Sequence, residues 1–268
     1  MTKEIQPTLK LSASTVQDPW GNLKQFTRAR IALGRVGSSL PTKEILSFGM
    51  SHAMARDAVH LALDVGALES QLRGLGCDVL KLHSRAPDRA SYLLRPDWGR
   101  RLNDESAEII KALPQQKLDV SIVIGDGLSS LAVQKHAAPM FQAVQQFMPS
   151  EWKLGPVVIA SQARVALADE VGELMNARMV ILLIGERPGL SSPDSLGLYL
   201  TYQPKVGCSD ADRNCISNVR LEGLSYEAAA KKLMWLSQES MRLKVSGVAL
   251  KDESDVHQID NDDRKLLT

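Results

Sequence analysis

A charged pair that directly follows an apolar run is the first place where this sequence could do chemistry. The run is Met179–Ile184, six consecutive apolar residues, and Gly185 separates it from Glu186 and Arg187. Such a run is typical of a strand that is covered on both faces of a sheet. Ligands bind at the carboxyl ends of strands in open α/β sheets, so these charges on a loop shaped by glycine and proline indicate a ligand site. A tight surface turn explains the same residues, and the segment alone leaves both interpretations open.

Two of the cysteines could act as metal ligands or reactive thiols. Cys208 and Cys215 lie seven residues apart, close to Arg213 and two aspartates. This spacing lacks a Cys-x-x-Cys pair and is a poor zinc signature, and the histidines show no HExxH pattern. Arg213 could make one thiol reactive by lowering its pKa, or the cysteines could be small buried residues. We therefore expect no metal site in this chain.

The turn GDGLSS, residues 125–130, resembles two catalytic motifs without completing either. Glycines after a strand can let a pyrophosphate approach a helix N-terminus, but Ser130 occupies the place of the third glycine. A nucleophile elbow needs the pattern GxSxG, and Leu131 stands where its last glycine belongs. The motif therefore supports a dinucleotide site only weakly and argues against a hydrolase.

The segment Ser84–Arg101 is rich in arginine and contains a helix-breaking Arg-Pro pair at Arg95. Arginines on an irregular segment could contact a phosphate or a partner protein, because the planar guanidinium matches such groups. Pairing with acidic residues of the same chain is an equally good explanation. The arginines are Arg85, Arg89, Arg95, Arg100 and Arg101, and the acidic candidates are Asp88, Asp97 and Asp104.

The composition is that of an ordinary globular protein. The 268 residues are 44% hydrophobic and 24% charged, which allows a full core in one or two domains. A formal net charge of +1 gives no general attraction to nucleic acid or to anionic membranes. No apolar run approaches the about 18 residues of a membrane span, and the first residues lack the apolar core of a signal peptide. Three cysteines suit reduced thiols, so we expect a cytoplasmic protein with neither nucleic acid nor membrane as partner.

Strands and helices alternate in the second half of the chain. Short apolar runs predict strands at 120–124, 157–160, 179–184 and 196–202, and a further one at 77–82. Helical patterns lie between them, one of them capped by Ser129 or Ser130, and Ser225 begins another that continues to about Leu243. This alternation predicts an α/β fold with a Rossmann-like parallel sheet and flanking helices.

Four regions follow from this pattern. We expect a flexible arm at 1–21, a mainly helical N-terminal region at 22–116, a Rossmann-like domain at 117–251 and a flexible polar tail at 252–268. The helical region should pack on the sheet and on a partner. It contains a helix that Thr42 caps and that continues to Val65.

Several long words of the sequence resemble one protein family, the small subunit of ethanolamine ammonia-lyase. GERPGLSSPDSLG and DADRNCISN begin at Gly185 and Asp210, and both match this family. Five further words match in the same order: TRARIALGRVG, SHAMARDAVH, SYLLRPDWGRRL, IGDGLSSLAV and ARVALADEVGE. The resemblance covers about Asn22 to Lys251 and is far more specific than any short motif.

The resemblance implies a cofactor and a partner. In this family adenosylcobalamin lies between the small subunit and a large barrel-shaped subunit, which binds ethanolamine. The matching residues that contact the cofactor are Val165, Glu186 and Cys215. The chain has no Asp-x-His-x-x-Gly word, and the resemblance likewise implies that cobalamin keeps its own base on cobalt. The radical conversion of ethanolamine to acetaldehyde and ammonia then belongs to the cofactor, so we expect no catalytic residue here and no activity from the chain alone.

The residues alone leave two other classes open. One is a stand-alone dinucleotide-binding oxidoreductase, and the other is a non-catalytic protein that binds a partner through its arginines. Relatives often enter a bacterial microcompartment by an amphipathic helix at the amino end. Here Pro7 and Pro19 interrupt that region and no clear apolar stripe is present, so free cytoplasm and encapsulation both stay open.

Overall fold

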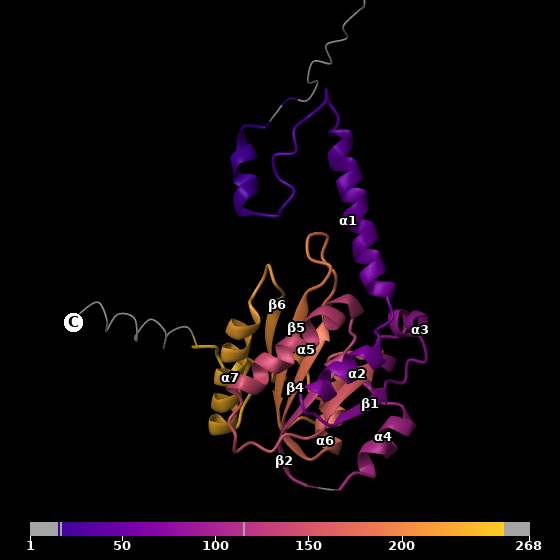
Figure 1. The fold of residues 1–268 in the computed structure, drawn as a ribbon, viewed down its shortest axis with the longest axis vertical. Helices are drawn as coiled ribbons and strands as arrows, with labels where there is room; N and C mark the ends of the chain where they lie inside the picture. Colours follow the sequence, from indigo (N-terminus) through magenta and orange to yellow (C-terminus); the bar gives the residue numbers. More distant parts are fainter. Residues whose placement is uncertain (1–15, 17, 115, 255–268) are drawn as a thin grey trace, which may run out of the picture. The chain divides into compact units, whose positions relative to one another are not determined.

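The computed structural model describes residues 16, 18–114 and 116–254 (Figure 1). They fall into two compact units, one from the described part of Met1–Ala55 with Gly189–Ser191, and one from Arg56–Pro188 and the described part of Ser192–Thr268. Most of the expected arm at 1–21 and tail at 252–268 lies outside the described residues. The predicted boundaries at 21/22 and 116/117 stay predictions. None of the described helices is long and apolar enough to span a membrane.

The N-terminal unit contains a short 3-10 helix, η1 (Pro19–Phe26), and most of helix α1 (Thr42–His60). Asp18 caps η1, because its Oδ1 accepts a hydrogen bond from the backbone N–H of Trp20 at 2.9 Å. α1 begins at Thr42, so the residue predicted as its cap is its first helical residue. The predicted extension to Val65 was wrong because Asp64 caps a new helix, accepting from the N–H of Ala67.

The second unit is built on one mixed sheet. Its strands within the described residues are β1 (Val79–His83), β2 (Leu118–Gly125), β3 (Val157–Ser161), β4 (Ala177–Gly185), β5 (Leu196–Tyr202) and β6 (Arg213–Val219). Their order across the sheet is β1-β3-β2-β4-β5-β6. The first four run parallel, whereas β5 is antiparallel to β4 and β6 is antiparallel to β5. The predicted α/β class is confirmed.

The predicted parallel arrangement holds for the first four strands and was wrong for β5, which is antiparallel to β4. Parallel neighbours need a long crossover connection, usually a helix, whereas antiparallel neighbours need only a loop. Residues 186–195 connect β4 to β5, and residues 203–212, which contain only the short η3 (Asp210–Asp212), connect β5 to β6. β6 was not predicted as a strand, because its sequence RNCISNV mixes exposed polar residues with only a few buried ones.

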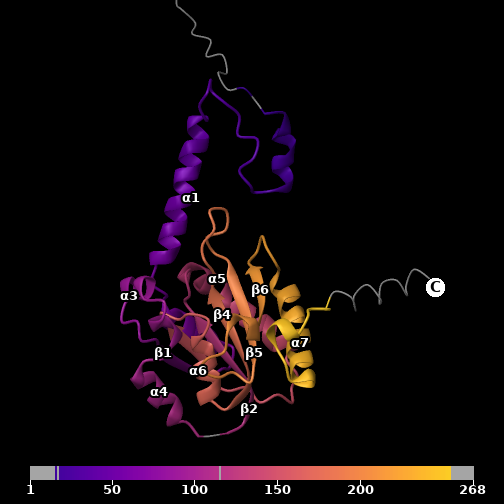
Figure 2. The same cartoon turned by 180° about the vertical axis from the view of Figure 1, so that it is seen from behind.

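Helices cover both faces of the sheet (Figures 1 and 2). One face packs against α2 (Val65–Gly74), α5 (Ser130–Phe147) and α7 (Tyr226–Leu243). The other packs against α4 (Asp104–Lys111) and α6 (Leu167–Leu174). Two short helices, α3 (Arg89–Leu94) and η2 (Trp98–Arg100), lie between β1 and α4 in the chain, and η4 (Gly247–Ala249) follows α7. The caps Ser129 of α5 and Ser225 of α7 confirm the predicted helix starts.

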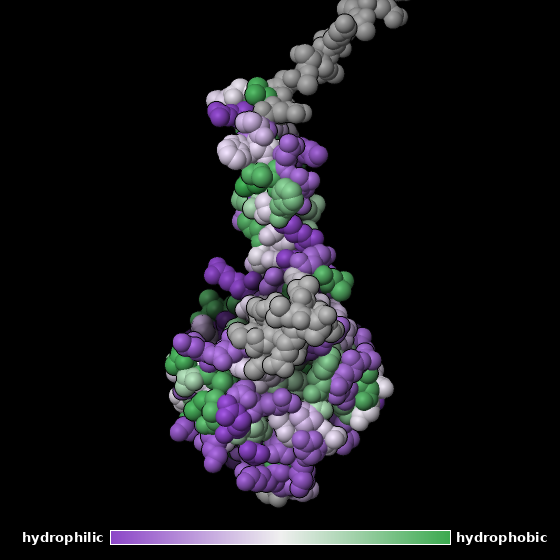
Figure 3. Space-filling model, turned by 90° about the vertical axis from the view of Figure 1, so that its left-hand side faces the viewer, coloured by the Kyte–Doolittle hydropathy of each residue, from purple (hydrophilic) through white to green (hydrophobic). Residues whose placement is uncertain are grey.

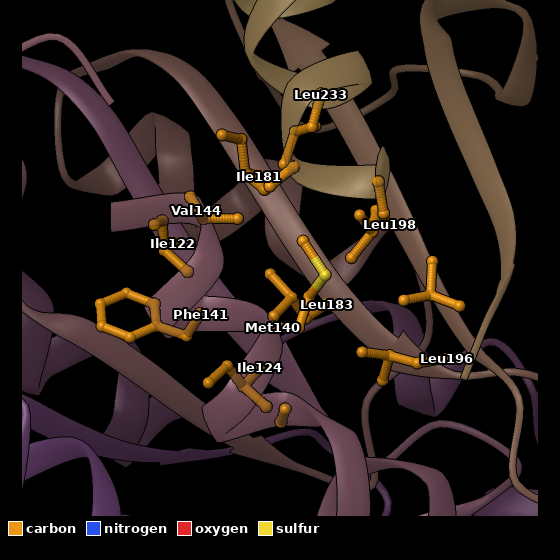
Figure 4. Close-up of a cluster of buried hydrophobic side chains, with 14 of the residues drawn as sticks. Ile122, Ile124, Met140, Phe141, Val144, Ile181, Leu183, Leu196, Leu198 and Leu233 are labelled. Carbon is orange, nitrogen blue, oxygen red and sulfur yellow. The ribbon is translucent and has the colours of Figure 1, made fainter. Parts of the chain in front are cut away.

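Strand β4 shows why the sheet needs both layers. Ile181 and Leu183 pack with α5 and α7 on one face, where they meet Phe141 and Leu233 (Figure 4). Val180, Leu182 and Ile184 belong to the cluster on the other face. Each of these strand residues is 5% exposed or less. Burying one such side chain contributes about 1.5–3 kcal/mol, so the run that was predicted as a doubly covered strand anchors both cores.

At the carboxyl end of β4 two backbone turns touch. The N–H of Leu128 donates to the carbonyl oxygen of Gly185 at 3.0 Å. Gly127 has a φ of +58°, and a Cβ there would lie 2.2 Å from that same oxygen. A Cβ on Gly185 would lie 2.1 Å from the carbonyl oxygen of Ser129. Gly127 of the GDGLSS turn therefore serves close packing against the backbone of Gly185, which leaves no support for a dinucleotide site there.

Gly127→Ala should destabilise the protein strongly, by at least about 3 kcal/mol, because it adds a steric collision to the cost of a positive φ. Gly76→Ala is the matched control, since Gly76 has a φ of +81° but no atom within 4 Å of an added Cβ. The free energy of unfolding of that control should fall by only about 1–2 kcal/mol. Urea unfolding of both variants measures the difference, and equal losses would show that the contact with Gly185 is unimportant.

Candidate functional site

The loop between β3 and α6 carries Val165 and is held by a buried carboxylate. Asp126, which is 3% exposed, accepts hydrogen bonds from the N–H groups of Gln162 and Ala163, both at 2.9 Å. Gln162 has a φ of +54°, so its backbone is in a conformation that needs such support. Arg89 approaches the same carboxylate at 3.7 Å, while burial raises the pKa of Asp126. These contacts set the path of the chain just before Val165.

Tyr92 supports the same loop through a hydrogen bond, and the sequence did not indicate this role. It is fully buried, and its hydroxyl donates to the carbonyl oxygen of Ala163 at 3.1 Å. The guanidinium groups of Arg89 and Arg164 lie over its ring, 4.6 and 4.2 Å from the centroid. Burial raises the pKa of Tyr92 to about 12, so the hydroxyl stays a donor at neutral pH.

Glu186 follows β4 and is held by the neighbouring strands. Its N–H donates to the carbonyl oxygen of Ser195 at 2.9 Å, and the hydroxyl of Ser195 donates to its Oε2. The N–H of Asn218 on β6 donates to the same oxygen at 3.2 Å. Oε1 accepts no hydrogen bond within the described part of the chain, and Gly197 leaves space beside it. One carboxylate oxygen is therefore available to a ligand.

Cys215 lies on strand β6, which the sequence pattern did not predict as a strand. It pairs with Tyr199 of β5 and is exposed, with its Sγ 3.4 Å from the hydroxyl oxygen of Ser217. Burial raises the pKa of Tyr199, and the adjacent Cys215 and Glu186 raise it further. Tyr199 thus lies beside both predicted residues, although its place in an apolar strand gave no signal of this in the sequence.

A hollow of about 410 Å³ joins these segments at the carboxyl edge of the sheet. Val165 and Glu186 both line it, together with Tyr92, Tyr199 and Arg187. Cys215 does not line it and is connected to it through Tyr199. The structure therefore brings two of the three predicted residues to one surface and places the third next to it. Another hollow, of about 310 Å³, lies where β1 and β2 begin and contains none of them.

The hollow combines a mainly apolar wall with a few polar groups at its border. Its walls are mainly aliphatic and aromatic, with one carboxylate and two guanidinium groups at its border. No nucleophile in it contacts a general base, as covalent catalysis would need. Among the described residues, no group of three or more His, Cys, Asp or Glu side chains could hold a metal ion. Such a site suits a broad apolar ligand with polar groups at its rim.

Most of the arginines of Ser84–Arg101 form contacts within the chain. Arg95 pairs with Asp97 at 2.7 Å, as one interpretation of the sequence predicted. Arg101 instead forms two hydrogen bonds with Glu170, both at 2.9 Å, and Arg89 faces Asp126. Local sequence could not show the last two pairs, because their acidic partners lie on segments far along the chain. Arg100 forms no ion pair with a described residue.

Fold and site together define an α/β protein with a hollow at the carboxyl edge of a mixed sheet. The profile of the ethanolamine ammonia-lyase light chain matches residues 17–251. The small subunit from Pseudomonas syringae pv. tomato is 56% identical over 250 residues, covering 92% of this chain and 87% of the relative. The small subunit from Pseudomonas fluorescens SBW25 is 55% identical over 254 residues, covering 93% and 92%. The chain belongs to the ethanolamine ammonia-lyase small-subunit family.

The pair of Arg101 and Glu170 should give a pH-dependent contribution to stability. Glu170 also accepts from the N–H of Leu102 at 2.8 Å, and so ties α6, directly after Val165, to the arginine segment. Burial raises the pKa of Glu170, but Arg101 and Leu102 outweigh burial and hold it below its ordinary value. Stabilisation by such a carboxylate is present above its unfolded pKa of about 4.3 and disappears as pH falls through the lower folded pKa.

Glu170→Gln should therefore lower the free energy of unfolding by about 2 kcal/mol at pH 7, and by less as the pH falls below about 4. Glu108→Gln is the control, because Glu108 pairs with Lys111 on the exposed face of α4 and should lose under about 0.5 kcal/mol. Denaturant titrations at pH 7 and pH 3.5 test this expectation. A loss that is the same at both values would contradict the ionic role of Glu170.

Proposed function

We propose that this chain helps to bind adenosylcobalamin at the interface with the large subunit of ethanolamine ammonia-lyase. The observation that carries the proposal is that Val165 and Glu186, both matched to cofactor contacts of the family, line one hollow with Tyr199. In this assignment 117–251 is the cofactor-binding domain, Rossmann-like in its β-α-β part. The complex is a carbon–nitrogen lyase of ethanolamine degradation.

The residues of the hollow suit a corrinoid. A corrin is a broad apolar disc with amide side chains at its rim. Val165 and Tyr199 offer apolar surface to the disc or to the base, and the open Oε1 of Glu186 can accept from a rim amide, a charge-assisted bond that fixes orientation. Cys215 extends this wall. Bound with its own base on cobalt, adenosylcobalamin supplies the radical chemistry that converts ethanolamine to acetaldehyde and ammonia.

The N-terminal unit offers a surface for the large subunit. Ile45, Leu46, Phe48 and Met50 of α1 are 53%, 68%, 44% and 63% exposed. Figure 3 shows green, hydrophobic residues on the surface of this unit. Several large apolar side chains exposed on one helix are typical of a segment that another protein covers. We infer that the large subunit covers them and binds ethanolamine, in the cytoplasm or within a microcompartment.

Mixing experiments test the division between the subunits. With ethanolamine and adenosylcobalamin, acetaldehyde should form only when this chain and its cognate large subunit are combined, because neither holds the complete cofactor site. A coupled alcohol dehydrogenase assay follows the product. Turnover by this chain alone would refute the proposal, and so would a stable complex that binds no cobalamin.

Glu186→Ala should raise the adenosylcobalamin concentration needed for half-maximal activity about tenfold, since one charge-assisted hydrogen bond is lost. The control is Ser195→Ala, which removes a donor to Glu186 but leaves its carboxylate in place. That variant should change the same concentration less than about threefold. If both variants have the same effect, Glu186 acts by shaping the loop rather than by contacting the cofactor.

A further inference from the structure

A second hollow adjoins the first and is surrounded by arginines. It has a volume of about 410 Å³, and Arg164 and Val165 line both hollows. Arg100 and Arg213 complete the arginines of its wall, and Asp210 is its one acidic residue. A molecule bound over Val165 in the first hollow therefore lies directly beside this basic surface.

The three arginines differ in how far their charge is neutralised. Arg213, only 3% exposed, donates to Asp210 at 2.9 Å and also to the buried carboxylate of Asp169, so two acids balance it. Within the described ranges, neither Arg100 nor Arg164 forms an ion pair with a carboxylate. Arg164 donates through Nη2 to the carbonyl oxygen of Tyr92 at 3.2 Å, and its buried Nε–H has no acceptor among the described residues.

Backbone contacts bring the main-chain segments of these two arginines together. The N–H of Arg164 donates to the carbonyl oxygen of Gly99, the residue before Arg100, at 2.7 Å. A Cβ on Gly99 would lie 2.8 Å from the Cγ of Arg164, so a side chain at Gly99 would displace it. Both residues line one hollow without a carboxylate partner among the described residues, so an anion bound there is attracted by both charges.

We propose that Arg100 and Arg164 bind the phosphodiester of the nucleotide loop of cobalamin, an inference that rests on the cofactor assigned in the proposed function. The phosphodiester is the anionic group on the periphery of the cofactor, whose other rim groups are neutral amides. A hollow with a mainly apolar wall, an open carboxylate oxygen and Arg187 at its border, next to a hollow lined by two guanidinium groups that have no carboxylate partner among the described residues, matches such a molecule. The fork of a guanidinium also fits two phosphate oxygens.

Corrinoids that differ in the phosphate test this assignment. The complex of this chain with its large subunit is titrated with cyanocobalamin, with cobinamide phosphate and with cobinamide, which lacks the phosphate, and binding is followed by equilibrium dialysis and visible absorbance. Arg100→Gln should raise the Kd of the two phosphate-bearing corrinoids about fivefold and that of cobinamide less than about twofold. Arg100→Lys, which keeps the charge, should lose less. Arg100 is exposed, so these substitutions leave the core intact.

Arg95→Gln is the matched control, because Arg95 lies on the same segment, pairs with Asp97 and lines neither hollow. It should leave all three Kd values unchanged. Equal weakening of the three corrinoids by Arg100→Gln, or no weakening, would overturn the assignment. Failure of that variant to assemble would also overturn it, by assigning Arg100 to an acidic group of the large subunit. If wild-type complex binds no corrinoid, the proposed function itself falls.

Discussion

The carboxyl edge of this sheet depends on one buried carboxylate. Asp126 directly follows β2 and accepts hydrogen bonds from two N–H groups of the β3–α6 loop. Arg89 faces it, and also donates to the carbonyl oxygens of Val59 at 2.6 Å and Gly127 at 2.8 Å. A buried charge is costly unless it is paired and hydrogen-bonded, so removing either partner would leave the other uncompensated. This network fixes the backbone on both sides of the hollow, although neither Asp126 nor Arg89 lines it.

The mixed sheet extends that edge beyond its parallel strands. β5 begins where β4 ends, with Leu196 paired to Gly185 on one side and to Val219 on the other. The carboxyl end of β6 therefore returns to the same edge, and the N–H of Asn218 reaches Glu186 from there. A wholly parallel sheet would need crossover helices at this position. Two antiparallel strands provide a wall at this edge instead, and Tyr199 and Cys215 are part of it.

Local pattern predicted the α/β class, five of the strands and the caps of α5 and α7, because apolar runs and capping residues act over a few positions. It missed β6, whose polar edge sequence resembles a loop, and it missed the antiparallel direction, which depends on what connects the strands. Val165 and Glu186 were predicted as site residues from the family resemblance, and both line one hollow. Tyr92 and Asp126 could not be singled out, since their partners, on the β3–α6 loop, are 36 or more residues away. The cofactor role of all three matched residues stays a prediction.

A subunit that binds a cofactor without reacting with it has particular physical requirements. Its contacts must be rigid, because a cofactor that carries its own chemistry needs orientation more than proton transfer. The backbone contact between Gly127 and Gly185, the buried network around Asp126 and the clamp from Arg101 to Glu170 all limit motion around the hollow. On that frame lie Oε1 of Glu186, which accepts no hydrogen bond from a described residue, and Arg100 and Arg164, which pair with no described carboxylate. Under the proposed function a bound cofactor satisfies these groups, because leaving them unpaired beneath a partner protein would cost stability.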